Sequence, residues 1–208
     1  MNETSHDRPR VDRILDILTV VLLSITAVIT AWCGFEASKW GGEMSIAFSQ
    51  ASSARVQAAS AESTAQAARQ YDLTVYTEWV LAEADGRQEL GQFIEERFTP
   101  EFALAFDAWN AENRASQGPF AMEEYVPPGA VEAEELNARA DAKFDEALAN
   151  NQRGDDYSLL TVLFALVLFF AALSQHQSAA WRRRTFLALS AAIAVVGFVI
   201  LLTFPIKI

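Results

Sequence analysis

The sequence has very few of the residues that support disulfide bonds, metal sites or nucleophilic catalysis. It contains one cysteine, Cys33, so an intrachain disulfide cannot form. Its two histidines, His6 and His176, have no partner at metal-ligand spacing, which argues against a zinc site. Nucleophilic catalysis needs a base beside an activated Ser or Cys. We therefore expect no metal, no cofactor and no catalytic residue, and hence a protein that is not an enzyme.

Three long stretches lack charged side chains altogether. They run from Ile17 to Phe35, from Tyr157 to Trp181 and from Thr185 to Ile206. At about 1.5 Å per helical residue, each can cross a hydrocarbon core about 30 Å thick. The sequence therefore predicts an all-α integral membrane protein. Its three transmembrane helices are expected at residues 14–35, 157–174 and 185–204.

The basic flanks of these spans predict their orientation. Three arginines lie within residues 1–13, and three more lie within residues 175–184. Because Lys and Arg resist translocation, we expect both segments to face the cytoplasm. Residues 36–156 and 205–208 are then extracytoplasmic. No small-x-small cleavage site follows the first span, so we expect it to remain as an anchor.

Basic residues are scarce between the first two spans. Residues 36–156 contain 23 Asp or Glu against 9 Lys or Arg, a net charge of about −14. Such a surface excludes nucleic acid as a partner.

Proline and glycine are absent from Glu43 to Ala84, which favours one long helix. A second helix is expected from Arg87 to about Arg97, and a third begins at Pro100 with Thr99 as its cap.

The rest of this segment predicts a helical hairpin domain. Residues 116–129 hold two glycines and three prolines, and are expected to form a loop. A helix then resumes near Val131, runs to about Arg153 and leads into the second span. Before the loop, apolar residues recur every three or four positions, which is typical of one packed face. They are Leu90, Ile94, Phe98, Phe102, Phe106 and Trp109.

Alternating steps of four and three along the first long helix select one stripe of mostly small or hydroxyl-bearing residues. Within and just before the first span, the stripe comprises Asp12, Asp16, Thr19, Leu23, Thr26 and Thr30. Beyond Gly41 and Gly42, the same steps reach Ala47, Ala51, Ala54, Ala58, Ala61, Ala65 and Ala68. Small side chains allow close helix approach, so these alanines are expected to pack against another helix.

Two interpretations of this stripe remain open. In the first, it packs against residues 131–153 of the same chain. In the second, the first helices of several copies surround an axis, so that the aspartates form acidic rings, the threonines line a water path and Leu23 constricts it. Such a pore would favour cations. Against the pore, a threonine can bond the carbonyl of the preceding helical turn without any water.

Two acidic residues, Asp155 and Asp156, precede the second span directly. At an outer pore entrance they would concentrate cations. The alternative is that they cap the start of the span. Aromatic residues near the same boundary, Trp40 and Tyr157 among them, are expected to anchor the protein at the membrane interface.

Three segments carry a family resemblance. They are AWCGFEASKWGGE at residues 31–43, PFAMEEY at residues 119–125 and TVLFA at residues 161–165. Together they resemble an uncharacterised family of small bacterial three-span inner-membrane proteins with an extracytoplasmic helical insert. The resemblance implies a bacterial inner membrane and a three-span topology, and it carries no activity with it.

Two functions from different classes follow from the sequence. The first is a homo-oligomeric, cation-permeable channel lined by the first transmembrane helix, since three spans are few to enclose a path alone. The second is a non-catalytic envelope scaffold or assembly subunit that binds another envelope protein through its helical domain. Residues 116–129 are then the segment to delete. Both functions place the chain in a lipid bilayer.

Overall fold

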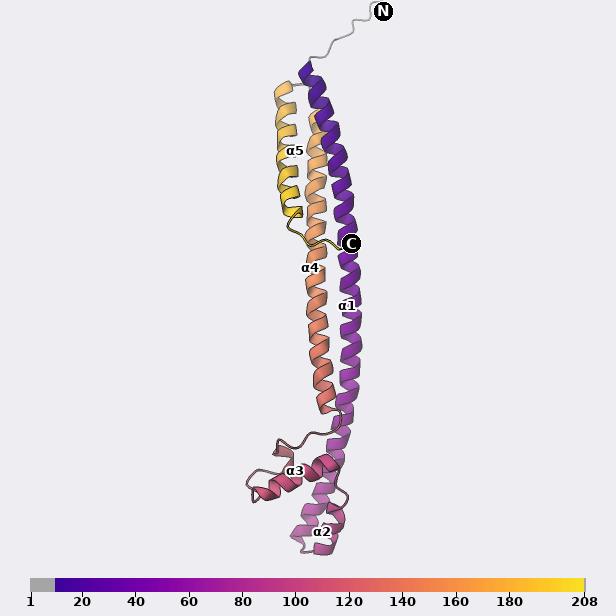
Figure 1. Ribbon diagram of the computed structural model, residues 1–208, viewed down its shortest axis with the longest axis vertical. Coiled ribbons are helices and arrows are strands. Elements are labelled where there is room, and N and C mark those ends of the chain that lie inside the picture. The colour runs from indigo at the N-terminus through magenta and orange to yellow at the C-terminus, as the bar shows by residue number, and fades with distance from the viewer. Residues whose placement is uncertain (1–9, 208) are drawn as a thin grey trace, which may run out of the picture. The chain divides into compact units, whose positions relative to one another are not determined.

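The computed structural model describes residues 10–207, with side chains from Arg13 onward. This part of the chain is 84% helix and contains no strand. The elements are α1 (Arg10–Ala84), α2 (Gln88–Glu95), α3 (Pro100–Ala111), the 3-10 helix η1 (Pro119–Ala121), α4 (Ala130–Gln175) and α5 (Ala180–Leu201) (Figure 1). Three helices, α1, α4 and α5, are long and apolar enough to cross a membrane. The prediction of an all-helical protein with three helices that could span a membrane is confirmed.

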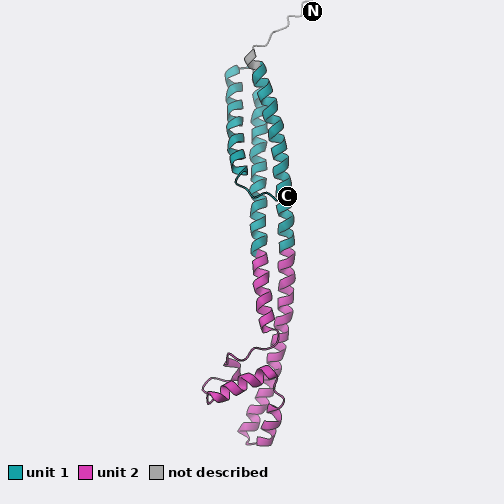
Figure 2. Cartoon of the chain, viewed as in Figure 1, with its two compact units in different colours: residues 1–47, 145–208 teal, residues 48–144 magenta. Residues whose placement is uncertain are grey.

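The chain divides into two compact units (Figure 2). Unit 1 comprises residues 1–47 and 145–208, and unit 2 comprises residues 48–144. Both α1 and α4 contribute to each unit. The predicted N-terminal segment, residues 1–13, lies mostly outside the described residues.

In unit 1, α1, α4 and α5 pack side by side around an apolar core (Figure 1). Tyr157, Leu160, Phe164 and Val167 recur every three or four residues on α4 and are buried. This spacing places them on one face of the helix. On α5, Gly197 lies so close to Phe164 that a Cβ atom there would be 3.0 Å from its ring. A small residue at this point lets the two helices approach closely.

Both long helices run through glycines without a break. The sequence predicted a span at residues 14–35 and one long helix from Glu43 to Ala84, and the structure joins them in α1, which continues through Gly41 and Gly42. Likewise, α4 continues through Gly154. A Cβ atom at Gly154 would lie 3.5 Å from the carbonyl oxygen of Ala37 and 3.7 Å from the Cβ of Trp40. These are ordinary van der Waals distances, and a Cβ atom at Gly41 or Gly42 would meet no atom within 4 Å, so packing does not require glycine at any of these three positions.

In unit 2, residues of α1 and α4 form an antiparallel pair. The rings of Phe48 and Phe144 lie 5.4 Å apart, and Arg55 bonds Asp141 at 2.6 Å. Residue numbers thus fall along α4 as they rise along α1. Four alanines of α1 are buried beside this pair: Ala51, Ala54, Ala58 and Ala61.

The loop into α4 makes the closest contact with α1. Gly129 has φ +87°, and a Cβ atom built there would lie 2.5 Å from the carbonyl oxygen of Ala61. Only glycine avoids both this clash and the strain of a positive φ. The loop is therefore fixed where α4 begins.

The remaining residues of unit 2, 70–129, form a segment that we call the head. At its start, α1 ends in a Schellman motif, with Gly86 at φ +70° and a bond from Arg87 N to Ala82 O of 2.9 Å. The predicted cap of α3 is confirmed, because the Thr99 side chain accepts a hydrogen bond from the Phe102 amide.

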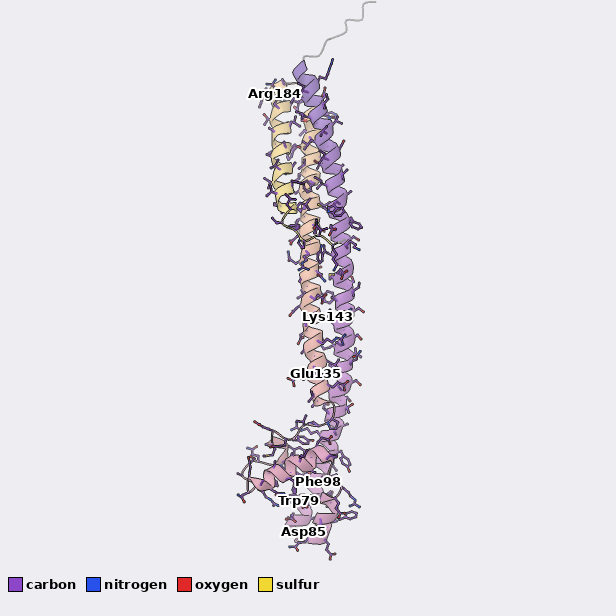
Figure 3. The ribbon with its side chains drawn as sticks, viewed as in Figure 1. Trp79, Asp85, Phe98, Glu135, Lys143 and Arg184 are labelled. Carbon is purple, nitrogen blue, oxygen red and sulfur yellow. The ribbon has the colours of Figure 1, made fainter. Side chains whose placement is uncertain are left out.

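The head is held together by aromatic rings. Its buried core consists of Trp79, Ala82, Ile94, Phe102, Phe106 and Trp109. Leu90, Phe98 and Phe120 pack against this core, and Figure 3 labels Trp79 and Phe98 within it. The apolar face predicted between Leu90 and Trp109 is therefore confirmed as a packing face. Residues 116–129 supply part of the core rather than a free loop.

Candidate functional site

The threonines of the predicted pore stripe lie inside unit 1. Thr19 is 0% exposed and Thr26 is 2% exposed. The Thr19 hydroxyl donates to the carbonyl of Leu15 at 2.8 Å, and the Thr30 hydroxyl donates to the carbonyl of Thr26 at 2.7 Å. Leu23 is half-buried. Thr19 and Thr30 therefore bond the preceding turn of α1 and require no water.

Asp16, near the N-terminal end of the predicted pore stripe, takes part in an ion pair. Its Oδ1 lies 2.6 Å from Nη2 of Arg183, which is largely buried. The side chain of Asp12 lies outside the described residues. The pair shows that the start of α1 and the start of α5 occupy the same end of unit 1. The pore stays a prediction, and the burial of Thr19 and Thr26 within one chain weighs against it.

The two acidic residues before the second span lie in the middle of α4. Asp155 accepts from the Asn151 amide at 3.2 Å, and Asp156 accepts from the Gln152 amide at 3.0 Å. Because α4 begins at Ala130, these residues cap no helix start, and the capping interpretation is wrong. That Asp155 and Asp156 concentrate cations at an outer pore entrance stays a prediction.

The seven alanines of the packing stripe differ in burial. Ala47 is buried in unit 1, and Ala51, Ala54, Ala58 and Ala61 are at most 7% exposed in unit 2. Ala65 and Ala68 are half-buried. This side of α1 is therefore already covered within one chain.

A buried carboxylate, Glu36, is the main feature of unit 1 that the sequence did not reveal. It is 0% exposed, and its Oε2 accepts from the backbone amide of Lys207 at 2.9 Å. Glu36 Oε1 and Trp40 Nε1 are buried with no hydrogen-bond partner among the described residues. The only sequence signal is a carboxylate one residue beyond the uncharged stretch that ends at Phe35.

The C-terminal residues close over this carboxylate. The Tyr157 hydroxyl donates to the carbonyl of Pro205 at 3.0 Å. Lys207 Nζ lies 3.5 Å from Glu43 and 5.5 Å from the Trp40 ring. Trp40 and Tyr157, expected from the sequence as membrane-interface anchors, here hold the C-terminal tail.

In the head, a second buried carboxylate, Asp72, joins three segments. It is 1% exposed and accepts from the hydroxyl of Thr99 at 2.7 Å and from that of Tyr125 at 2.9 Å. Burial raises the pKa of Tyr125, and so does its hydrogen bond to Asp72. The tyrosine therefore keeps its proton and remains a donor. Sequence reasoning missed this cluster because its members are far apart in the chain.

An exposed aromatic and arginine cluster lies on the head surface. Phe93 and Tyr71 are each 52% exposed. The Arg97 guanidinium lies 3.3 Å from the centroid of the Phe93 ring, and the Tyr71 hydroxyl lies 3.5 Å from the Arg97 carbonyl oxygen. We call Tyr71, Phe93 and Arg97 the head patch.

The chemistry of these sites is that of packing and contact. Within the described part of the chain, no three His, Cys, Asp or Glu side chains converge to hold a metal ion. Asp72 and Glu36 each fix one chain segment against another. No family model, curated protein or solved structure matches the chain. Any functional conclusion therefore rests on the geometry described above.

Proposed function

We propose that the chain is a non-catalytic scaffold or assembly subunit of a bacterial inner membrane, and that its head binds another envelope protein. The head patch is the observation that carries this proposal. Aromatic residues and arginine are enriched where protein partners contribute most to binding energy. Tyr71, Phe93 and Arg97 combine these residue types on one exposed surface.

The core beneath the patch supports the same role. Ile94, next to Phe93, is buried among the aromatic rings of the head. The Trp79 indole donates to Glu95 at 2.7 Å, which fixes α2 against α1. A surface held this rigidly loses little side-chain and backbone freedom when a partner binds, which favours affinity.

The basic flanks favour an extracytoplasmic position for unit 2. Arg183 and its neighbours lie at the same end of unit 1 as Asp16. Glu36 and the C-terminal tail lie at the opposite end of the apolar segments. If arginines mark the cytoplasmic side, α1 emerges on the outer side just before unit 2 begins.

Point substitutions test the patch better than a loop deletion, since residues 116–129 supply Phe120 and Tyr125 to the head core. In membranes treated with a short cross-linker, wild-type protein should capture one envelope protein reproducibly. Phe93→Ala and Arg97→Ala should each reduce this capture by about tenfold or more, as expected for interface hot spots.

Leu104→Ala is the matched control, because Leu104 is an equally apolar, exposed residue of α3 outside the patch. It should leave capture unchanged. Equal loss from Leu104→Ala and Phe93→Ala would contradict a specific patch. Failure of the wild-type protein to capture any protein other than itself would contradict the proposal as a whole.

The channel remains the other function that the sequence predicted, and no structural observation favours it. A pore lined by α1 would have to expose Thr19 and Thr26, which are buried within one chain. We therefore expect purified protein to be electrically silent in planar bilayers. Steady conductance that changes with Thr26→Ala or Leu23→Ala would reverse this conclusion.

A further inference from the structure

Two buried polar atoms of α1 have no hydrogen-bond partner within the part of the chain that the structure describes. They are Oε1 of Glu36 and Nε1 of Trp40. Glu36 is 0% exposed and Trp40 is 5% exposed. Buried polar groups of folded proteins nearly always have a partner, because leaving one unpaired costs free energy. The two atoms therefore indicate a bound molecule that meets their hydrogen-bonding needs.

The two atoms have opposite hydrogen-bonding roles. Glu36 and Trp40 are four residues apart on α1, so their side chains are neighbours on the helix surface. An ionised carboxylate oxygen only accepts hydrogen bonds, whereas an indole N–H only donates. A molecule that satisfies both must donate to Glu36 and accept from Trp40.

Other contacts hold both side chains in place. The second oxygen of Glu36, Oε2, accepts from the backbone amide of Lys207 at 2.9 Å. Two cations lie over the Trp40 ring: the guanidinium carbon of Arg153 is 4.7 Å from its centroid and Lys207 Nζ is 5.5 Å from it. These contacts oppose the rotations that would bring the two unpaired atoms together.

The surroundings of these atoms favour a small molecule. Cys33 and Tyr157, which belong to the same buried core as Trp40, are both 0% exposed. The ring of Phe204 lies 5.3 Å from that of Tyr157, and Lys207 follows it across the carboxylate. Residues of α1, α4 and the C-terminal segment thus enclose the site. A lipid headgroup would need an opening to the surface, whereas a single water molecule needs none.

Water also has the required chemistry. Buried waters make about three hydrogen bonds on average, mostly to polar groups that would otherwise be unpaired, and each water both donates and accepts. Glu36 lies one residue beyond the uncharged stretch that ends at Phe35. A carboxylate so close to the apolar spans is costly unless hydrogen bonds replace its hydration.

We propose that unit 1 binds one water molecule, which accepts a hydrogen bond from Trp40 Nε1 and donates one to Glu36 Oε1. The amide of Lys207 holds the other carboxylate oxygen, so water and C-terminal segment together complete the hydrogen bonding of Glu36. The water thereby stabilises the closure of this segment over α1. This proposal concerns unit 1 alone and does not depend on the head patch.

Infrared difference spectroscopy of the purified chain in detergent tests for the water directly. The spectrum of the wild type minus that of Trp40→Phe should contain an O–H stretching band of a hydrogen-bonded water. This band should move to lower frequency when the solvent is replaced by water that carries the heavy oxygen isotope. Glu36→Leu, which removes the acceptor, should abolish the band.

Ultraviolet resonance Raman spectroscopy reports whether the Trp40 indole N–H is hydrogen-bonded. The Trp40 band, obtained as wild type minus Trp40→Phe, should lie at the hydrogen-bonded position and should shift to the unbonded position in Glu36→Leu. Glu62→Leu, at an exposed carboxylate of the same helix, is the matched control and should leave both spectra unchanged. If Glu36→Leu does not fold, the wild-type and Trp40→Phe spectra still decide the proposal.

Three results would overturn the proposal. The first is a Trp40 band at the unbonded position in the wild type. The second is the absence of any isotope-sensitive water band. The third is a bonded Trp40 that responds to Glu36→Leu without such a band, which would mean that the two side chains bond each other directly. None of these results bears on the head patch, so the two proposals fail separately.

Discussion

In unit 1 the buried hydroxyl of Thr19 bonds the carbonyl of Leu15, four residues back on the same helix, whereas in unit 2 the hydroxyl of Thr99 bonds Asp72 across 27 residues. The first bond is complete as soon as the helix forms. The second forms only when the head folds. Helices that enter a bilayer must arrive with most polar groups already satisfied. A domain that folds in water can use the same groups to join distant segments.

Two regions within unit 2 also fill their cores differently. The alanines of α1 in unit 2 let α4 approach closely, while the head beside them relies on large rings in edge-to-face contact. Close-packed small residues tolerate no added volume, and packed rings tolerate no loss of it. A larger side chain should therefore be most damaging among the alanines, and a smaller side chain should be most damaging among the rings of the head.

The largest effect is expected from removing a ring of the head. Phe102 is 0% exposed and contacts Phe98, Tyr76, Phe120 and Tyr125. Phe102→Ala should lower the free energy of unfolding of the head by about 3–5 kcal/mol. Urea unfolding followed by tryptophan fluorescence measures this. Leu104→Ala on the same helix should stay within about 0.5 kcal/mol, and an equal loss there would contradict the assigned core.

A smaller effect is expected from the polar centre of the head. Asp72→Asn puts an amide group where one of the two carboxylate oxygens accepts from Thr99 or Tyr125. The cost should be about 2–3 kcal/mol, because the lost bond is to a charged group and is buried. The same unfolding experiment applies, with exposed Asp107→Asn as the control. If both variants unfold alike, Asp72 does not join these segments.

Added volume in the alanine stripe should cost about 1–3 kcal/mol. Ala58 is 1% exposed, so Ala58→Leu forces α1 and α4 apart. Ala67→Leu, at an exposed position of the same helix, is the control. Thermal unfolding measured by circular dichroism should separate the two variants by several degrees. A neutral Ala58→Leu would show that the two helices are not tightly packed at this point.

The hydrogen bond from Tyr157 to Pro205 helps to hold the tail of unit 1 to α4. Tyr157→Phe removes the donor to Pro205 and should cost about 1 kcal/mol, which is about a fivefold rise in hydrogen exchange near Lys207. Exchange can be measured on the C-terminal peptide by mass spectrometry. The matched change Tyr71→Phe, in unit 2, should not alter this peptide. Unchanged exchange after Tyr157→Phe would mean that the contacts of Lys207 with α1 secure the tail without this bond.

The smallest expected effect tests the comparison between hydroxyls that bond their own helix and hydroxyls that join two segments. Thr19→Val removes a hydroxyl that bonds only its own helix and should change stability by less than about 0.5 kcal/mol. Ser190→Ala removes a bond from α5 to the carbonyl of Val167 on α4, and should cost about 1 kcal/mol. Unfolding in mixed detergent micelles compares the two. A larger loss from Thr19→Val would break the distinction drawn between local and cross-linking hydroxyls.

The sequence predicted the structural features that depend on residues close together in the chain. Uncharged runs indicated the three spans, and the order of Thr99 and Pro100 indicated the start of α3. The apolar spacing from Leu90 to Trp109 indicated the face that forms the head core. Each of these signals lies within a few helical turns, where periodicity and capping determine structure.

The sequence could not reveal contacts between distant residues. Asp72 meets Tyr125 across 53 residues, and Glu36 meets Lys207 across 171. Both carboxylates look like ordinary acidic residues in an acidic chain until the fold buries them. The continuity of α1 at Gly41 was also hidden, because the low helix propensity of glycine favours a break there.

The surroundings of Gly129 restrict which amino acids this position can accept. Any side chain at that position would enter the space of the Ala61 carbonyl and would also be held at an unfavourable φ. No compensating substitution at Ala61 can help, because the obstructing atom belongs to the main chain and is the same for every amino acid. In a saturation library scored for folding, we expect position 129 to accept glycine alone. The neighbouring Pro128 is exposed and should accept many replacements.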